Sequence, residues 1–121
     1  MNNTQSLKLN KDYKRLYYRG KTIAGKIIVV YVAKNRKNYN RLGLTCSKAI
    51  GKAVKRNRVK RLMRESYRLL EANIKNGTDI VIVARSRAAF CKCQKVKNEL
   101  EYILNKLDLL EKNEETTNIG C

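Results

Sequence analysis

The sequence predicts an α+β domain in which a single mixed β-sheet packs against three helices. Three short runs rich in apolar residues have the length of strands, and two longer segments repeat apolar residues at helical spacing. A shorter helical pattern lies near the start of the chain. We expect strands at residues 24–33, 41–47 and 79–85, and helices at 10–19, from about 52 to 76 and from about 94 to 111.

The first expected strand, residues 24–33, is apolar on both faces. One face carries Ile27, Val29 and Tyr31, and the other carries Ile28, Val30 and Val32. Such a strand belongs in the centre of a sheet. A polar loop of turn-forming residues separates it from residues 41–47, which predicts an antiparallel hairpin. Residues 41–47 and 79–85 flank a long helix, so we expect these two strands to be parallel.

A short helix is expected between Asn10, a suitable N-cap, and Gly20, a suitable residue after the last turn. Tyr13, Leu16 and Tyr17 share one side of this helix. Aromatic residues on one helix face are most often part of the core. Cations lie beside these two tyrosines, however, so the rings could equally form a platform on which unpaired bases stack. The sequence leaves both interpretations open.

The most informative segment is Ser47–Arg68, which predicts a turn at Gly51 followed by a long basic helix. At 100° per residue its side chains separate into an apolar stripe and a basic stripe. The apolar stripe consists of Val59, Leu62, Met63, Leu69 and Leu70. The basic stripe consists of Asn57, Lys60, Arg61, Arg64 and Arg68 and extends over about 16 Å. The apolar stripe requires a core to pack against.

The cations of the basic stripe repel one another, and few acidic residues lie near enough to relieve the repulsion. Glu65 is about 100° from the middle of the stripe, and only Glu71 comes near its edge. One interpretation is a solvated Lys/Arg face, the usual role of a charge run. The other is a contact surface for a polyanion.

The charge of the chain is large and unevenly distributed. It contains 28 Lys and Arg against 10 Asp and Glu, a formal net charge of +18 over 121 residues. Between Tyr13 and Arg64 there are 17 basic residues and no acidic ones. Nucleic acid is the partner that fits best, because neutralising phosphates releases counterions. An anionic membrane fits less well, since no helix combines the basic face with exposed Trp, Phe or Leu anchors.

The composition also limits location and chemistry. No apolar run is long enough to span a membrane and no signal peptide opens the chain, so we expect a cytoplasmic protein. The four cysteines, Cys46, Cys91, Cys93 and Cys121, lack zinc-site spacing, and we expect reduced thiols rather than a metal site. There is no histidine, and the acids are scattered. We therefore assign no catalytic residue to this chain.

The two ends of the chain are expected to differ. Residues 1–9 are polar and are expected to be loosely structured. The last helix places one apolar face toward the core: Val96, Leu100, Ile103, Leu104 and Leu107. Residues 112–121 are rich in Asn, Glu and Thr and are expected to be disordered. We thus expect one nucleic-acid-binding domain, residues 1–111, followed by a tail.

The segment Lys48–Arg61, KAIGKAVKRNRVKR, resembles the signature of the bacterial ribonuclease P protein subunit. In that family an Arg-Asn-Arg motif opens a long helix and follows a Lys-x-x-Gly-x-Ala-Val run. Other similarities follow the family's order over roughly residues 7–110, including a short aromatic helix that ends in Gly and an Asp-led apolar strand that ends in Ala-Arg. The motif is long and therefore specific.

The resemblance implies a protein cofactor for a catalytic RNA, which removes the 5′ leader from precursor tRNA. The divalent metal ions of the reaction, Mg2+, are implied to be bound mainly by the RNA, with one protein for each RNA. The resemblance also implies a left-handed crossover between the two parallel strands, whereas physical reasoning alone predicts a right-handed one.

The resemblance assigns residues to two RNA partners by their positions in the family's motifs. The residues assigned to the leader of precursor tRNA are Tyr13, Lys14, Arg15, Tyr17 and Tyr31. The residues assigned to the RNA subunit are Lys48, Lys52, Arg56, Asn57, Arg58, Lys60, Arg61, Arg64 and Arg68. Asn57 is interpreted as a bridge to backbone or phosphate groups, and the alternative is a residue that only starts the helix.

Two other functions are weighed against this one. A ribosomal or other structural RNA-binding protein would have the same size, charge and fold class, but would show no preference for tRNA that carries a leader. A nuclease in its own right would cleave RNA without an RNA subunit. The missing histidines and scattered acids argue against the nuclease.

Overall fold

The computed structural model describes residues 4–111 and contains five strands and three helices. The strands are β1 (Thr4–Ser6), β2 (Lys21–Ala24), β3 (Ile28–Lys34), β4 (Asn40–Cys46) and β5 (Thr78–Ala84). The helices are α1 (Asn10–Arg19), α2 (Ala53–Leu70) and α3 (Cys93–Lys106), with short 3₁₀ segments at Lys48–Ile50, Glu71–Asn73 and Ser86–Phe90. The tail predicted at residues 112–121 lies outside the described residues.

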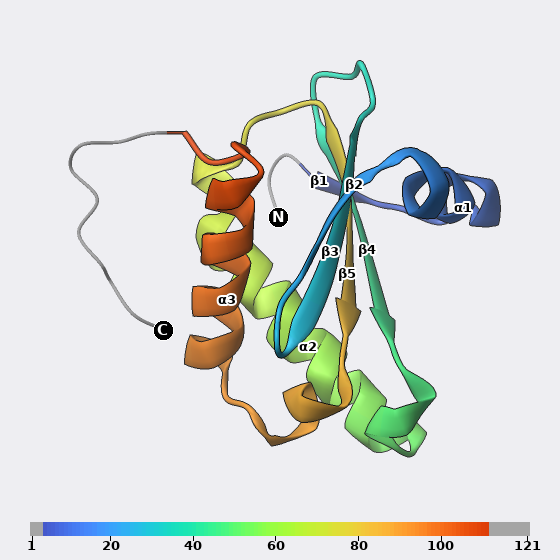
Figure 1. Ribbon diagram of the computed structural model, residues 1–121, viewed down its shortest axis with the longest axis vertical. Helices are drawn as coiled ribbons and strands as arrows, with labels where there is room; N and C mark the ends of the chain where they lie inside the picture. Colours follow the sequence, from blue (N-terminus) through green and yellow to red (C-terminus); the bar gives the residue numbers. More distant parts are fainter. Residues whose placement is uncertain (1–3, 112–121) are drawn as a thin grey trace.

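The strands form one mixed sheet in the order β1-β4-β5-β3-β2. Figure 1 shows this sheet nearly edge-on, with α2 and α3 on one face and α1 on the other. The prediction of a single mixed sheet packed against three helices is confirmed. The hand of the crossover stays a prediction.

The strand pairing differs from the predicted hairpin. β4 and β5 are parallel, as expected, with Leu42 opposite Ile80. β3 pairs antiparallel with β5, with Val30 opposite Ile82. β3 and β4 run in opposite directions but do not pair, because β5 lies between them. The prediction of a β3–β4 hairpin was wrong because β5, buried at every position except Val83, takes the centre of the sheet.

Both edge strands were absent from the sequence-based prediction because they are short and polar. β1 lies within the segment expected to be loose, yet it pairs in parallel with β4. The next residue, Leu7, is buried and its N–H donates to the Leu42 carbonyl at 2.9 Å. The hydroxyls of Thr4 and Tyr67 are 2.8 Å apart, which links β1 to α2. The expectation of a loose N-terminus is therefore wrong from Thr4 onward.

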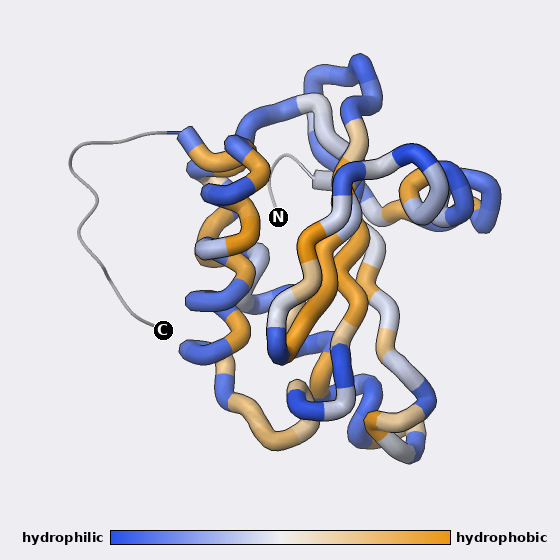
Figure 2. Tube along the Cα trace, viewed as in Figure 1, coloured by the Kyte–Doolittle hydropathy of each residue, from blue (hydrophilic) through white to orange (hydrophobic). Residues whose placement is uncertain are grey.

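The main core lies between the sheet and the two helices α2 and α3. Figure 2 shows apolar residues along the central strands and on the sides of these helices that face them. Val59 and Met63 of α2 are buried as predicted, but Leu69 is 40% exposed and Tyr67 is buried instead. α3 contributes the predicted apolar face, in which Val96, Leu100, Ile103 and Leu104 are buried and Leu107 packs against the core.

The long helix is shorter than the sequence suggested. α2 ends at Leu70, and a 3₁₀ segment follows before Ile74 forms a bridge with Leu110. The chain must turn early to reach this bridge, so the helix cannot continue to residue 76. The end of α1 at Gly20 is as predicted, but its cause differs. Gly20 is extended, and a Cβ there would lie 2.5 Å from the Leu16 carbonyl oxygen, so the close approach of the backbone requires glycine.

Candidate nucleic-acid interface

A cluster of three tyrosines lies where α1 crosses the sheet. Tyr13 and Tyr17 come from α1 and Tyr31 from β3. The ring centroids of Tyr17 and Tyr31 are 4.8 Å apart in an edge-on arrangement, and those of Tyr13 and Tyr17 are 6.5 Å apart. The three predicted aromatic residues are therefore brought together, and we call them the tyrosine cluster.

The members of the tyrosine cluster are not equally exposed. Tyr13 is half-buried, and its hydroxyl donates to the Leu7 carbonyl at 3.1 Å. Gly43 of β4 makes room for this ring, because a Cβ there would lie 2.5 Å from the Tyr13 hydroxyl oxygen. Burial, and then the neighbouring Tyr17, raise the pKa of Tyr13, so its hydroxyl remains a donor at neutral pH. Tyr17 is 43% exposed, so Tyr13 has a packing role while Tyr17 remains accessible.

A buried carboxylate attaches α1 to the sheet beside this cluster. The Asp79 side chain, which is fully buried, accepts hydrogen bonds from Arg41 Nε and Nη2 at 2.8 and 2.6 Å and from Arg15 Nη2 at 2.8 Å. Asn35 Nδ2 donates to it at 2.9 Å, and Arg41 also pairs with Asp12 at 3.4 Å. Sequence reasoning treated Asp79 only as the start of a strand. Its position before an apolar run gives no indication of these partners.

The charge of Asp79 is stabilised despite its burial. Burial alone would raise the pKa of this carboxyl group, but the hydrogen bonds from Arg41 and Asn35 and the charges of Arg41 and Arg15 lower it below its usual range. Arg15, which the family resemblance assigned to the leader, thus has part of its guanidinium committed to Asp79. The other assigned cation of α1, Lys14, is exposed.

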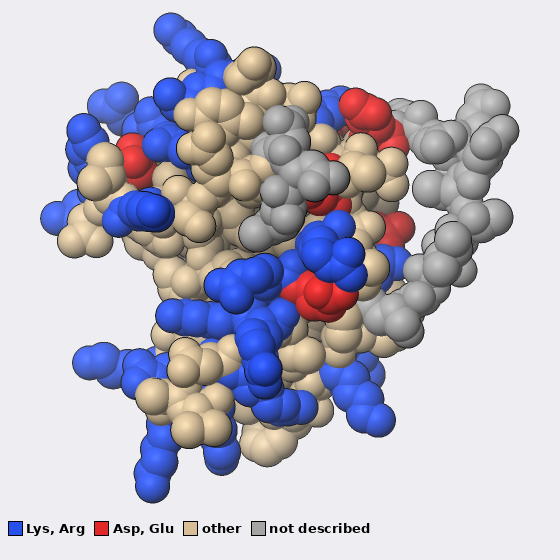
Figure 3. Space-filling view, turned by 180° about the vertical axis from the view of Figure 1, so that it is seen from behind, with Lys and Arg blue, Asp and Glu red and all other residues tan. Residues whose placement is uncertain are grey.

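The sheet face that carries the tyrosine cluster extends beyond α1. Figure 1 places α1 over the end of the sheet at which β5 begins, and the start of α2 near the opposite end. Between them, one row of the sheet carries Val29, Val83 and Thr45, which are paired across β3, β5 and β4 and are only half-buried. Figure 3 shows the corresponding recess between the Lys/Arg group over α1 and the group around the start of α2.

The basic stripe of α2 is exposed along most of its length. Figure 3 shows Lys and Arg side chains in a band over this helix. Arg61, Arg64 and Arg68 are exposed and Lys60 is half-buried. The prediction that Glu65 is too far away to compensate the stripe was wrong for Arg68, since these two form an i,i+3 ion pair. Among residues 4–111, no carboxylate pairs with Lys60, Arg61 or Arg64.

The start of α2 forms a small basic pocket of about 220 Å3. It is lined by Cys46, Ala53, Arg56, Asn57 and Lys60. Arg56 Nε is buried without a hydrogen-bond partner among the described residues. Burial raises the pKa of the Cys46 thiol, although Lys60 and Arg56 oppose the shift, so the thiol remains protonated at neutral pH.

The other residues assigned to the RNA subunit lie around the same helix end. Asn57 is exposed within the first turns of α2, and the neighbouring Arg58 donates to the Ala89 carbonyl at 3.1 Å. Lys48 lies in the preceding 3₁₀ segment, and Lys52 precedes the first residue of α2. A helix N-terminus with exposed cations favours phosphate groups, because the free N–H groups and the helix dipole add to the side-chain charge.

Other features bear on chemistry and location. Within residues 4–111, no three His, Cys, Asp or Glu side chains come together as metal ligands. No helix in this part of the chain is long and apolar enough to cross a membrane. The described cysteines, Cys46, Cys91 and Cys93, are not disulfide-bonded.

A mixed sheet with an accessible tyrosine cluster and a long basic helix, in which among the described residues only Arg68 is paired with a carboxylate, is typical of RNA-binding proteins. Comparison with known proteins specifies the family. The family model described as Ribonuclease P matches residues 1–108. The chain belongs to the ribonuclease P protein family, whose members work with an RNA subunit in tRNA processing as part of the endonuclease that matures tRNA 5′ ends. Ribonuclease P is a ribonucleoprotein and is generally metal-dependent.

The similarity to individual relatives covers nearly whole chains. The ribonuclease P protein component of Caldanaerobacter subterraneus subsp. tengcongensis is 45% identical over 108 residues, which are 89% of this chain and 93% of the relative. That of Alkaliphilus metalliredigens is 39% identical over 110 residues, 91% and 99% of the two chains. The RNase P protein structure from Staphylococcus aureus aligns with a TM-score of 0.79 at 33% identity, over 88% of this chain and 97% of that one. The Thermotoga maritima structure gives 0.76 and 30%, over 84% and 96%.

Proposed function

We propose that this chain holds the 5′ leader of precursor tRNA in the recess between α1 and α2 and binds the RNA subunit through the basic face of α2. The observation that carries the proposal is the tyrosine cluster, which lies at one end of an uncovered sheet face that leads toward the Arg56–Arg58 segment. A single strand needs aromatic faces for its bases and cations for its backbone, and this surface provides both.

The residues of α1 divide into two roles in this proposal. Tyr17, which is accessible, stacks on a leader base, and the exposed Lys14 approaches the backbone. Tyr31 supports Tyr17 through their edge-on contact. Arg15 acts mainly as a positioning residue, because its contact with Asp79 fixes α1 against the sheet.

The basic face of α2 acts on the RNA subunit through charge. Lys60, Arg61 and Arg64 lower the repulsion between the RNA subunit and the precursor tRNA, and thereby lower the metal concentration that the ribozyme needs. The RNA binds most of the Mg2+ in this proposal. In support, the deeply buried carboxylate Asp79 is already saturated by Arg15, Arg41 and Asn35. We propose a cytoplasmic complex with one protein for each RNA.

Binding of the leader is tested by comparing precursor tRNA with mature tRNA on the ribonucleoprotein assembled from this chain and a bacterial ribonuclease P RNA. We expect precursor tRNA to bind about tenfold more tightly, because one stacked base contributes about 1–3 kcal/mol. The RNA alone is the control and should discriminate less. Equal affinities for the two tRNAs would contradict the proposed leader site and favour a general RNA clamp.

Binding of the RNA subunit is tested by its salt dependence. The triple variant Lys60→Gln/Arg61→Gln/Arg64→Gln should reduce the slope of log K against log salt by about 2–3, since each phosphate contact contributes roughly 0.7–0.9. The matched control, Lys92→Gln/Lys95→Gln/Lys106→Gln, removes the same charge from exposed positions at α3 and should leave the slope near the wild-type value. An equal reduction in both variants would show that only net charge matters.

A further inference from the structure

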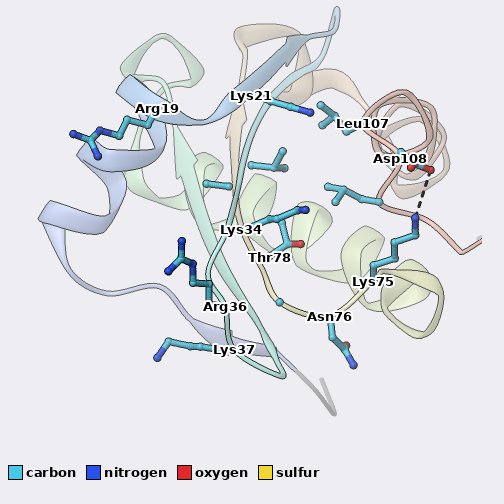
Figure 4. Close-up of a pocket in the computed structure, with 14 residues that line it drawn as sticks. Arg19, Lys21, Lys34, Arg36, Lys37, Lys75, Asn76, Thr78, Leu107 and Asp108 are labelled. Atoms are coloured by element: carbon cyan, nitrogen blue, oxygen red, sulfur yellow. Dashed lines mark ion pairs between the residues drawn. The ribbon is translucent and has the colours of Figure 1, made fainter.

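A second basic site lies at the opposite end of the sheet from the start of α2. It is a cavity of about 750 Å3. It lies beyond the end of α3 at Lys106, and residues of β2, β3 and the start of β5 line it together with Leu107–Leu109. Figure 4 shows Lys21, Lys34 and Lys75 extending toward this cavity from three different segments. We call it the lysine pocket. It contains no residue assigned to the leader or to the RNA subunit.

The strand register explains why these lysines converge. Lys21 is paired with Val32, and Lys34 with Thr78, so each lysine points to the same sheet face as its partner. Val32 belongs to the core between the sheet and α3, which identifies that face. Lys21 and Lys34 therefore face the α3 side of the sheet, whereas the tyrosine cluster lies on the α1 side.

The walls of the lysine pocket are fixed by backbone contacts. The Lys75 N–H donates to the Leu109 carbonyl at 2.8 Å, and the Asn35 N–H donates to the Gly77 carbonyl at 2.9 Å. Gly77 has a φ of +88°, and a Cβ there would lie 2.8 Å from the Lys37 carbonyl oxygen. Glycine is therefore required where the two loops meet. The pocket is thus a structural feature rather than a gap between loose loops.

The charge of the pocket is almost uncompensated. The side chains of Lys21, Lys34 and Lys75 extend into it, whereas Arg19, Arg36 and Lys37 also belong to its lining but point away from it (Figure 4). Asp108 is the only carboxylate in the lining, and it pairs with Lys75 at 3.5 Å. Among the described residues, none of the other five cations forms an ion pair. The positive charge that remains next to the cavity favours an anion as its ligand.

The lining also includes apolar surface. Val32, Leu107 and Leu109 lie beside the lysines and supply a wall against which a flat ring can pack. A cavity of this volume is within the range of sites for small organic ligands. Lysine ammonium groups are compact, flexible donors that suit phosphate oxygens. We propose that the lysine pocket binds a nucleotide, with its phosphates on Lys21, Lys34 and Lys75 and its base against Val32, Leu107 and Leu109.

The nucleotide has two possible sources, a free nucleotide or an unpaired nucleotide of a bound RNA. The test measures binding of ATP and of a short single-stranded RNA to the full chain by isothermal titration calorimetry at fixed salt. We expect Lys21→Gln/Lys34→Gln to weaken at least one of them by about tenfold, because each lost ammonium–phosphate contact is a charge-assisted hydrogen bond. Loss of ATP binding assigns the site to free nucleotides, and loss of RNA binding alone assigns it to RNA.

A matched control separates a site from a general charge effect. Lys92→Gln/Lys95→Gln removes two exposed lysines near the start of α3 and should change either affinity by less than about twofold. If the control weakens binding as much as Lys21→Gln/Lys34→Gln does, or if that variant weakens neither ligand, the proposal is overturned. These measurements use neither the RNA subunit nor precursor tRNA, so their failure would leave the proposed function intact.

A second variant should act in the opposite direction. Asp108→Asn removes the only carboxylate of the lining and frees Lys75, so it should tighten phosphate binding by about two- to fivefold. Asp108 has a φ of +58°, a conformation that Asn also tolerates, so the backbone should be unaffected. Weaker binding by this variant would contradict the proposed site.

Discussion

Replacing Asp79 with Asn should lower the free energy of unfolding by about 3–5 kcal/mol, the cost of leaving buried partners without their counter-charge. Asp79 is fully buried and accepts hydrogen bonds from Arg15, Arg41 and Asn35. An amide cannot accept from all of these donors, and it introduces N–H groups among cations. Denaturant unfolding measures the effect, and hydrogen exchange should show α1 losing protection first, because Arg15 joins this helix to the sheet.

The effect of Asp79 should depend on pH in a defined direction. Its pKa is lowered in the folded protein, so its contribution to stability is fully present above the ordinary carboxyl value of about 3.9. The contribution is lost as pH falls through the lowered folded-state pKa. The difference between wild type and Asp79→Asn should therefore be constant near neutrality and shrink below about pH 4. A suitable control is Asp108→Asn, which breaks an exposed pair and should change stability by less than about 1 kcal/mol. Equal effects of the two variants would contradict the structural role of Asp79.

Replacing Tyr17 with Ala should weaken precursor tRNA binding to the assembled ribonucleoprotein by about 1–3 kcal/mol and leave mature tRNA binding unchanged. Tyr17 is 43% exposed, so the loss of stability should be small compared with that of Asp79→Asn. Tyr17→Phe keeps the ring and should bind nearly as wild type does. Tyr18→Ala is the matched control, because Tyr18 is 88% exposed on the same helix but is not in the tyrosine cluster. Equal losses for Tyr17→Ala and Tyr18→Ala would contradict the proposed stacking site.

The parts of the fold that could be predicted from the sequence are those with strong local patterns. The parallel β4–β5 pair followed from the helix between them, and the apolar face of α3 followed from its spacing. The strand order could not be predicted, because β5 inserts between β3 and β4 through contacts distant in sequence. β1 could not be predicted because its three polar residues have no pattern of their own.

The candidate site was predictable in its residue types more than in its geometry. The basic stripe and the tyrosines were visible as patterns, and the structure brings Tyr13, Tyr17 and Tyr31 together. In the sequence, the acidic residues showed no pattern that would indicate a partner. Asp79 instead binds two arginines, and Glu99 accepts three backbone N–H bonds, each at 2.8 Å, from residues 26–28. Such partners are 38 to 73 residues away in the chain, so no local pattern reveals them.

The most direct test of the central claim is cleavage of precursor tRNA by a bacterial ribonuclease P RNA at low magnesium, with and without this protein. We expect the 5′ leader to be removed only when both components are present, and the protein alone to cleave nothing. Cleavage that is unchanged by the protein would contradict the proposed role, and would leave the basic face of α2 as a general RNA-binding surface.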